Sequence, residues 1–90
     1  MRLPRDWSGE KLAQHLRRFG YEVTRQTGSH MRLTTRQGGE HHVTITRHSP
    51  LRVGTLSAIL KDVAEHFGLD RDGILEGLLE GHRATQEPLR

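Results

Sequence analysis

Histidine and arginine are the residues of this 90-residue chain whose types and spacing suit chemistry. His30 directly follows Gly28 and Ser29, and Arg25 and Arg32 lie on either side of that turn. An imidazole accepts and donates protons near neutral pH, so it acts as a general base or acid. In metal-free RNA cleavage, a base removes the proton of a ribose 2′-OH, the oxygen attacks the neighbouring phosphorus, and cations stabilise the developing charge. His30 is therefore a candidate catalyst, and the alternative is a solvated histidine at a strand end.

Four other polar side chains are candidates for contact with phosphate. Arg47 lies beside the same predicted hairpins, and His42 and His48 suit RNA contact, with plain surface positions as the alternative. The segment PLRVGTL leads through Thr55 into a predicted helix N-terminus, whose free N–H groups attract phosphate. The alternative for Thr55 is a structural role as the cap of that helix.

The available ligands disfavour a metal centre. His30, His42 and His48 are the histidines from which a zinc site could be assembled, but the chain has no cysteine and only Glu22 adds a carboxylate on that sheet face. His41 and His42 are adjacent, so in a strand they point to opposite faces. We therefore expect no metal and no cofactor.

Composition and charge narrow the class of protein. The absence of cysteine favours a reducing compartment such as the cytoplasm, and the apolar runs are far too short to span a bilayer. Residues 1–52 carry ten Lys or Arg against four Asp or Glu, whereas residues 53–90 carry four against seven. A basic half of this kind indicates a polyanionic partner such as nucleic acid, and solvated arginines are the ordinary alternative.

Three segments have the spacing of amphipathic helices. The first and second each carry a single apolar stripe, and the third is short and weakened by internal glycines. We expect Ser8 to cap the first helix and Gly20 to end it. The corresponding residues are Thr55 and Gly68 for the second helix, and Asp70 and Gly81 for the third.

Between the first two helices the hydrophobic period changes to two, which predicts three antiparallel strands. Residues opposite one another share a face, so loops with an odd number of residues keep the apolar side chains together. We expect three-residue loops at 27–29 and 37–39. The pairs that follow are Val23 with Leu33, Gln26 with His30, Leu33 with Val43, Met31 with Ile45, and His30 near Thr46.

The simplest arrangement that buries the helix stripes and the apolar sheet face together is an α+β domain in the order α-β-β-β-α. Both single-striped helices cover the apolar face of a three-stranded meander. The other face, which carries His30, Arg32 and His42, is then open to water.

The segments LAQHLRRFGYEV, RQTGSHMRL and HHVTITRHSPLRVGTLSAIL together resemble the HicA family of toxins, also described as YcfA-like proteins. The similarity runs from about Leu12 to Leu79. Its most specific parts are Gly-Ser-His at 28–30 and Gly-Thr-Leu at 54–56, in the family's order and spacing. Members adopt a fold similar to the double-stranded-RNA-binding domain. We expect one such domain over residues 1–81, because the short third helix ends near Gly81, and a flexible tail over 82–90.

The same resemblance implies a function. Members are metal-independent endoribonucleases that cleave messenger RNA as toxins of type II toxin–antitoxin systems, and a HicB-type antitoxin covers the active site. The histidine of the Gly-Ser-His turn is the family's catalytic residue, and it corresponds to His30, which Gly28 and Ser29 present.

The chain also departs from the family. Residues 45–48 read Ile-Thr-Arg-His where Val-Pro-x-His is common, and Ser57 stands where a basic residue is common. Two other functions stay open: a non-catalytic RNA-binding module of the same fold, and a protein-interaction domain without an RNA role.

Overall fold

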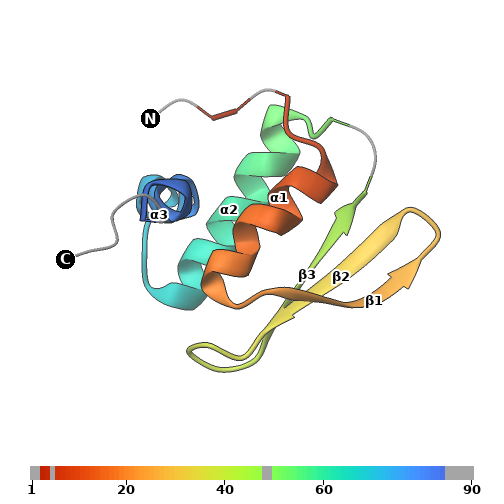
Figure 1. The fold of residues 1–90 in the computed structure, drawn as a ribbon, viewed down its shortest axis with the longest axis horizontal. Helices are drawn as coiled ribbons and strands as arrows, with labels where there is room; N and C mark the ends of the chain where they lie inside the picture. Colours follow the sequence, from red (N-terminus) through yellow and green to blue (C-terminus); the bar gives the residue numbers. More distant parts are fainter. Residues whose placement is uncertain (1–2, 5, 48–49, 85–90) are drawn as a thin grey trace.

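The computed structural model describes residues 3–4, 6–47 and 50–84 of the chain. It contains one antiparallel sheet in the order β1-β2-β3. The elements are α1 (Gly9–Leu16), the 3-10 turn η1 (Arg17–Phe19), β1 (Glu22–Thr27), β2 (His30–Thr35), β3 (His41–Thr46), α2 (Val53–Phe67) and α3 (Arg71–Ala84). This order confirms the predicted α+β fold, which is similar to the double-stranded-RNA-binding domain (Figure 1).

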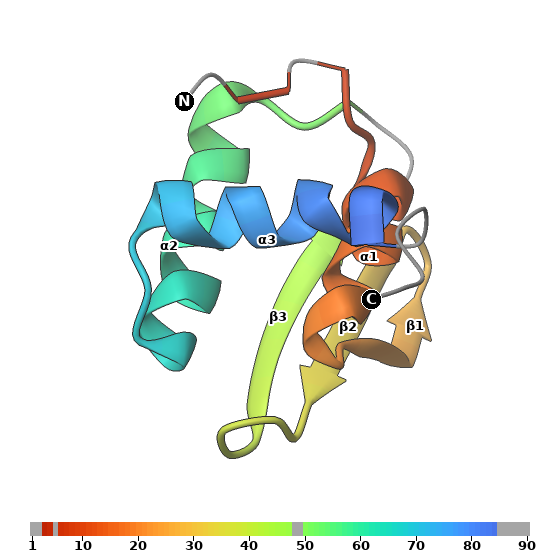
Figure 2. The ribbon, with the colours of Figure 1, turned by 60° about the vertical axis from the view of Figure 1, so that its left-hand side comes forward.

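The helices lie on one side of the sheet (Figure 1). α1 packs against β1 and β3, and α2 packs against β3. α3 contacts α1, η1 and α2. It crosses α1 and α2 on the side of these helices that faces away from the sheet (Figure 2). Among the described elements, none covers the second face of the sheet, which agrees with the predicted open face.

Two of the three predicted caps are present. The Ser8 hydroxyl oxygen accepts a hydrogen bond from the Lys11 N–H at 3.1 Å, and Asp70 Oδ1 accepts one from the Gly73 N–H at 2.7 Å. Each bond satisfies an N–H group that has no partner within its own helix. Gly20 follows η1 at φ 86°, in the left-handed region that ends helices.

The prediction that Thr55 caps α2 is wrong. The helix begins at Val53, and its N-cap is Arg52, which makes no side-chain capping bond. The preceding residue, Leu51, is buried in the core, and this anchor brings the chain into the helix two residues before Thr55. The far end agrees with prediction, because Gly68 ends α2 at φ 72°. α3 continues three residues beyond the expected Gly81, and the remainder of the expected tail, residues 85–90, lies outside the described residues.

The register between β2 and β3 confirms the prediction. Met31 lies opposite Ile45 and Leu33 opposite Val43, so all four apolar side chains share the face that the helices cover. His30 lies opposite Thr46. The alternation of polar and apolar residues is unbroken in these strands, and it fixes their pairing.

The register between β1 and β2 is only partly as predicted. Val23 does lie opposite Leu33, but Gln26 lies opposite Met31, and Thr27 takes the place opposite His30. The turn therefore has two residues rather than three. A β-bulge between Val23 and Arg25 supplies the extra residue that the alternation requires.

The core lies between the apolar sheet face and the helices. Its largest fully buried side chains are Tyr21, Leu12, Leu16, Leu33, Ile45, Leu56, Leu60, Ile74, Leu75, Leu78 and Val63. Val23 lies on this face as expected, opposite Leu33, but it is 47% exposed because β1 is the outer strand. Leu3 and Trp7 are buried without any periodic pattern in the sequence to indicate it, and Trp7 stacks on His15 with ring centroids 4.3 Å apart.

A chain of hydrogen bonds, buried at Tyr21 and exposed at Asp62, links the sheet to α2. The Tyr21 hydroxyl lies 2.7 Å from His41 Nδ1, and His41 Nε2 lies 3.2 Å from Asp62 Oδ1. An ionised carboxylate only accepts, so in neutral His41 the Nε2–H donates to Asp62, and Nδ1 accepts from Tyr21. Burial, and secondarily the charge of Asp62, raises the pKa of Tyr21 to about 12.

This raised pKa predicts a loss of stability in alkali. An unfolded tyrosine loses its proton near pH 10, so the stabilisation is complete below that pH and is lost as pH rises towards the folded value of about 12. Each pH unit in this window removes at most about 1.4 kcal/mol. The chain has one tyrosine, so ultraviolet absorbance reports this titration directly. Tyr21→Phe should lose this part of the pH dependence, and an unfolding free energy that declines equally in both proteins would contradict it.

Candidate active site

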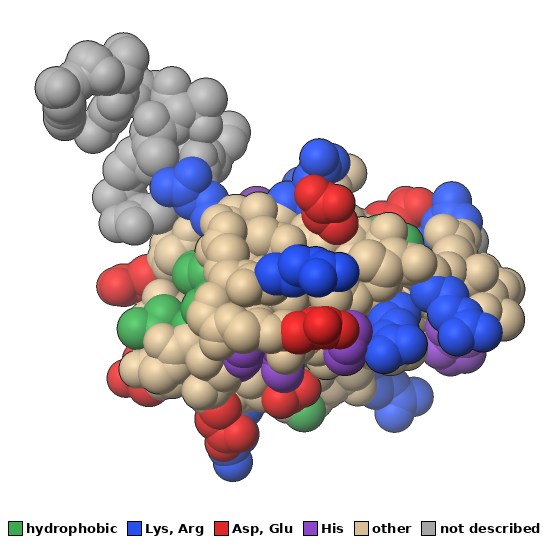
Figure 3. All heavy atoms as spheres, turned by 90° about the horizontal axis from the view of Figure 1, so that it is seen from below, with side chains coloured by type: hydrophobic (Ala, Val, Ile, Leu, Met, Phe, Trp, Pro, Cys, Tyr) green, Lys and Arg blue, Asp and Glu red, His purple; other side chains and the backbone are tan. Residues whose placement is uncertain are grey.

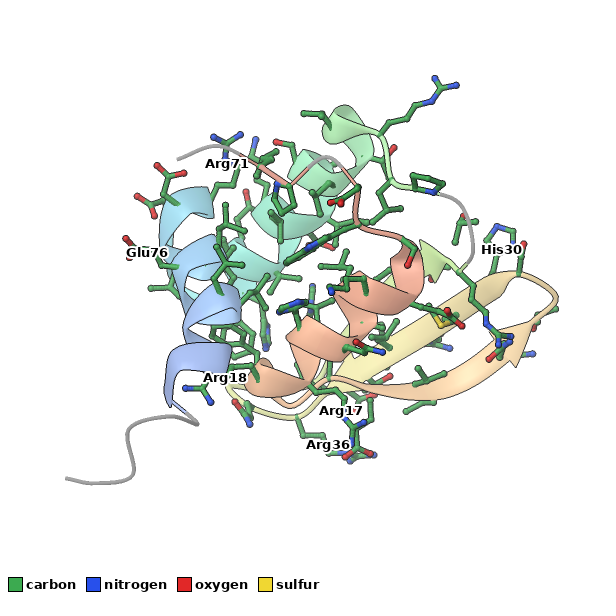
Figure 4. All side chains as sticks on the ribbon, turned by 45° about the horizontal axis from the view of Figure 1, so that its top comes forward. Arg17, Arg18, His30, Arg36, Arg71 and Glu76 are labelled. Atoms are coloured by element: carbon green, nitrogen blue, oxygen red, sulfur yellow. The ribbon has the colours of Figure 1, made fainter. Side chains whose placement is uncertain are left out.

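His30 is the first residue of β2 and projects from the sheet at the β1–β2 hairpin, far from α3 (Figure 4). Its side chain is exposed. It pairs with Thr27 on one side and Thr46 on the other, on the face that the helices leave open. Within the described residues its imidazole makes no hydrogen bond or ion pair. The ring is thus available to a ligand from solvent.

The turn before His30 depends on glycine for its conformation rather than for space. Gly28 has φ 58°, which an L-residue with a side chain adopts only at a cost of about 1–2 kcal/mol. A Cβ at this position would meet no atom within 4 Å. A positive φ at the first position only, with Ser29 outside that region, is the pattern of a type II′ hairpin turn.

The β-bulge brings a second arginine beside His30. Arg25 lies opposite Arg32 on the open face, whereas a regular strand would have turned it towards the helices. A shallow pocket of about 180 Å³ opens between these side chains. We call it the His30 pocket, and its lining residues are Arg25, Thr27, His30, Met31, Arg32 and Thr44.

The charge arrangement in the His30 pocket favours an anion. Like charges directly opposite one another destabilise an antiparallel pair, and Arg25 and Arg32 are in that relation. A bound phosphate would relieve their repulsion and would accept hydrogen bonds from both guanidinium groups. Seen from below, Lys and Arg side chains gather around a histidine at the hairpin end of the molecule (Figure 3).

The other predicted site residues lie elsewhere. Arg47 Nε–H donates to Glu10 Oε2 at 2.8 Å, so its guanidinium turns to α1 rather than lining the His30 pocket. Thr55 is exposed in the first turn of α2, within the helical layer. His48 lies outside the described residues.

His42 shares the open face with His30 but has partners of its own. Its Nε2 lies 3.0 Å from Glu40 Oε2, and its Nδ1 lies 2.8 Å from the Thr34 hydroxyl. In the neutral ring, Nε2–H donates to the carboxylate and Nδ1 accepts from Thr34. Its pairing position on the sheet is four residues along β2 from that of His30.

Neither a metal centre nor a membrane-spanning helix is found among the described residues. Among the residues that the structure describes, no three His, Cys, Asp or Glu side chains come together as a metal would require. In that part of the chain, no helix is both long and apolar enough to cross a bilayer.

Comparison with protein families identifies the chain. Searches of curated proteins and of solved structures found no match. Residues 9–64, more than half of the chain, match the family described as the HicA toxin of bacterial toxin–antitoxin systems. The matched segment includes α1, the whole sheet with the Gly-Ser-His turn, and most of α2. The chain therefore belongs to the HicA toxin family.

Proposed function

We propose that this protein is an endoribonuclease toxin that cleaves messenger RNA, with His30 as its proton-transfer residue. The observation that carries the proposal is the exposed His30 imidazole in a pocket with two facing arginines, on a sheet face free of helices. The proposal combines this arrangement with the family match.

The chemistry needs one proton acceptor and positively charged side chains around the phosphate. The His30 imidazole takes the ribose 2′-OH proton while the 2′ oxygen bonds to phosphorus. The bond from phosphorus to the 5′ oxygen then breaks, and that oxygen takes a proton from solvent. The products are a 2′,3′-cyclic phosphate and a 5′-hydroxyl end.

Arg25 and Arg32 contribute electrostatically. Negative charge builds up on the non-bridging phosphate oxygens as the 2′ oxygen attacks, and fixed guanidinium groups stabilise that charge. A planar guanidinium also holds a phosphate through two parallel hydrogen bonds, which fixes the reacting phosphorus relative to His30.

A HicB-type antitoxin is the proposed partner. The His30 pocket is shallow and exposed, so a partner inactivates it by covering it. The two arginines would favour an acidic side chain in the covering surface.

Induction in living cells tests the function. Wild-type protein should arrest growth and fragment messenger RNA, and His30→Ala should do neither at equal expression. Equal toxicity of the two proteins would contradict the catalytic role of His30. RNA binding without cleavage by the wild type would instead favour the non-catalytic binding module.

A further inference from the structure

We infer that Gly9 and Glu10, at the start of α1, are positioning residues for His30 and act through the backbone of Thr46 and Arg47. This inference rests on the proposed function for its effect on catalysis. Its structural part stands on the contacts between α1, the end of β3 and the β1–β2 turn.

The first contact is a close approach of backbones. A Cβ on Gly9 would lie 1.7 Å from the Thr46 carbonyl oxygen and 2.8 Å from Ile45 Cγ2. Gly9 does not have a positive φ, so the requirement for glycine here is spatial rather than conformational. The N-terminus of α1 thus lies directly against the last residues of β3.

The second contact fastens Arg47 from two directions. The Glu10 N–H donates to the Arg47 carbonyl oxygen at 3.1 Å, and Arg47 Nε–H donates to Glu10 Oε2 at 2.8 Å. The ion pair is only half-exposed, so solvent screens it less than a fully exposed pair. Backbone and side chain therefore hold the same residue to the helix.

The third contact reaches the turn. The Arg47 N–H donates to the Ser29 carbonyl oxygen at 2.7 Å, the shortest of these bonds. That carbonyl belongs to the peptide unit that begins His30, and His30 itself pairs with Thr46. Thr46 and Arg47 contact the start of α1, and the same two residues pair with His30 and bond to Ser29, where β2 begins.

Together these contacts form a line from α1 through 46–47 to the His30 backbone. Without these contacts, only the strand pairing of the sheet would position the β1–β2 turn, and the turn would lose its link to α1. Displacement of a reacting group by about 1 Å is enough to cost about 10²-fold in rate. The start of α1 therefore sets the position of His30 without touching RNA.

A pair of glycine substitutions tests this. Gly9 and Gly54 each lie in the first turn of a helix, but a Cβ on Gly54 would meet nothing within 4 Å. Gly9→Ala should lower kcat for RNA cleavage about 10²-fold with little change in KM. It should also speed hydrogen exchange of the Arg47 amide and shift the NMR signals of the His30 ring. Gly54→Ala should leave all of these unchanged.

A milder variant guards against simple unfolding. Glu10→Ala removes only the side-chain ion pair with Arg47. It should change kcat, the exchange of the Arg47 amide and the His30 ring signals in the same direction as Gly9→Ala, but by less. Lys11→Ala, at the neighbouring exposed position, should change none of the three. If Gly9→Ala and Glu10→Ala keep the Arg47 amide protected and the His30 signals in place, the inference is wrong whatever the activity. A rate loss that merely follows the folded fraction would also overturn it. Retention of wild-type cleavage by His30→Ala is a separate result, which would contradict the proposed function.

Discussion

His30→Ala should lower the rate of RNA cleavage by the purified protein by about 10²–10⁴-fold, the contribution typical of one positioned general acid or base. The loss should fall on kcat, because in the proposed mechanism the imidazole acts on the proton of the 2′-OH rather than on the phosphate that holds the RNA. Cleavage of a short synthetic RNA under single-turnover conditions measures it.

The same substitution should leave the fold intact. His30 is exposed and makes no hydrogen bond within the described residues, so its removal leaves no buried partner unsatisfied. The unfolding midpoint should therefore stay unchanged. His66→Ala is a matched control, since this half-buried histidine on α2 bonds to the Gln37 carbonyl oxygen, on the helical side of the molecule. It should retain the cleavage rate in its folded fraction. A His30→Ala protein that cleaves at the wild-type rate would eliminate His30 as the catalyst.

Replacement of both Arg25 and Arg32 by alanine should move function and stability in opposite directions. RNA binding should weaken, and the slope of log K against log salt should become shallower by about 0.7, because the two arginines hold one phosphate between them and each neutralised phosphate on a single strand contributes about 0.7. The folded protein should become more stable by up to about 1 kcal/mol, since two like charges no longer face each other across the strands.

Salt titration of RNA affinity and urea unfolding measure these two effects. Arg18→Ala is the control, because this exposed arginine lies in η1, at the other end of the molecule from His30 (Figure 4). It should leave the salt slope of binding nearly unchanged. An unchanged slope in the double variant would place the RNA phosphates outside the His30 pocket.

The sequence predicted the β2–β3 half of the sheet because its alternation is complete there. Met31, Leu33, Val43 and Ile45 leave one register that buries them all, and the structure has that register. The position of His30 on the open face follows from it.

The β1–β2 half was harder because a bulge adds a residue without a hydrophobic signal. Thr24 and Arg25 are both polar, so alternation alone does not show that both turn to the open face. A two-residue Gly-Ser turn is the commoner hairpin connection, and its conflict with parity was the available sign of a bulge. Unbroken alternation would put Arg25 on the apolar face with Val23, whereas the bulge turns it to the open face opposite Arg32.

The contacts around Arg47 were beyond sequence reasoning for a different reason. Glu10 and Arg47 are 37 residues apart, and their ion pair exists only because α1 packs against the end of β3. Gly9 carries a signal in retrospect, since a helix-start glycine costs stability unless the space is needed. Nothing in the sequence says which neighbour needs that space.

The bulge in β1 also affects how copies of the protein meet one another. β1 is an outer strand, and a flat outer strand offers a row of unpaired N–H and C=O groups to any passing strand. A bulge interrupts that row and twists it, and the charge of Arg25 discourages a second copy from adding its own edge. The irregularity that completes the His30 pocket is thus also a safeguard against aggregation through the sheet edge.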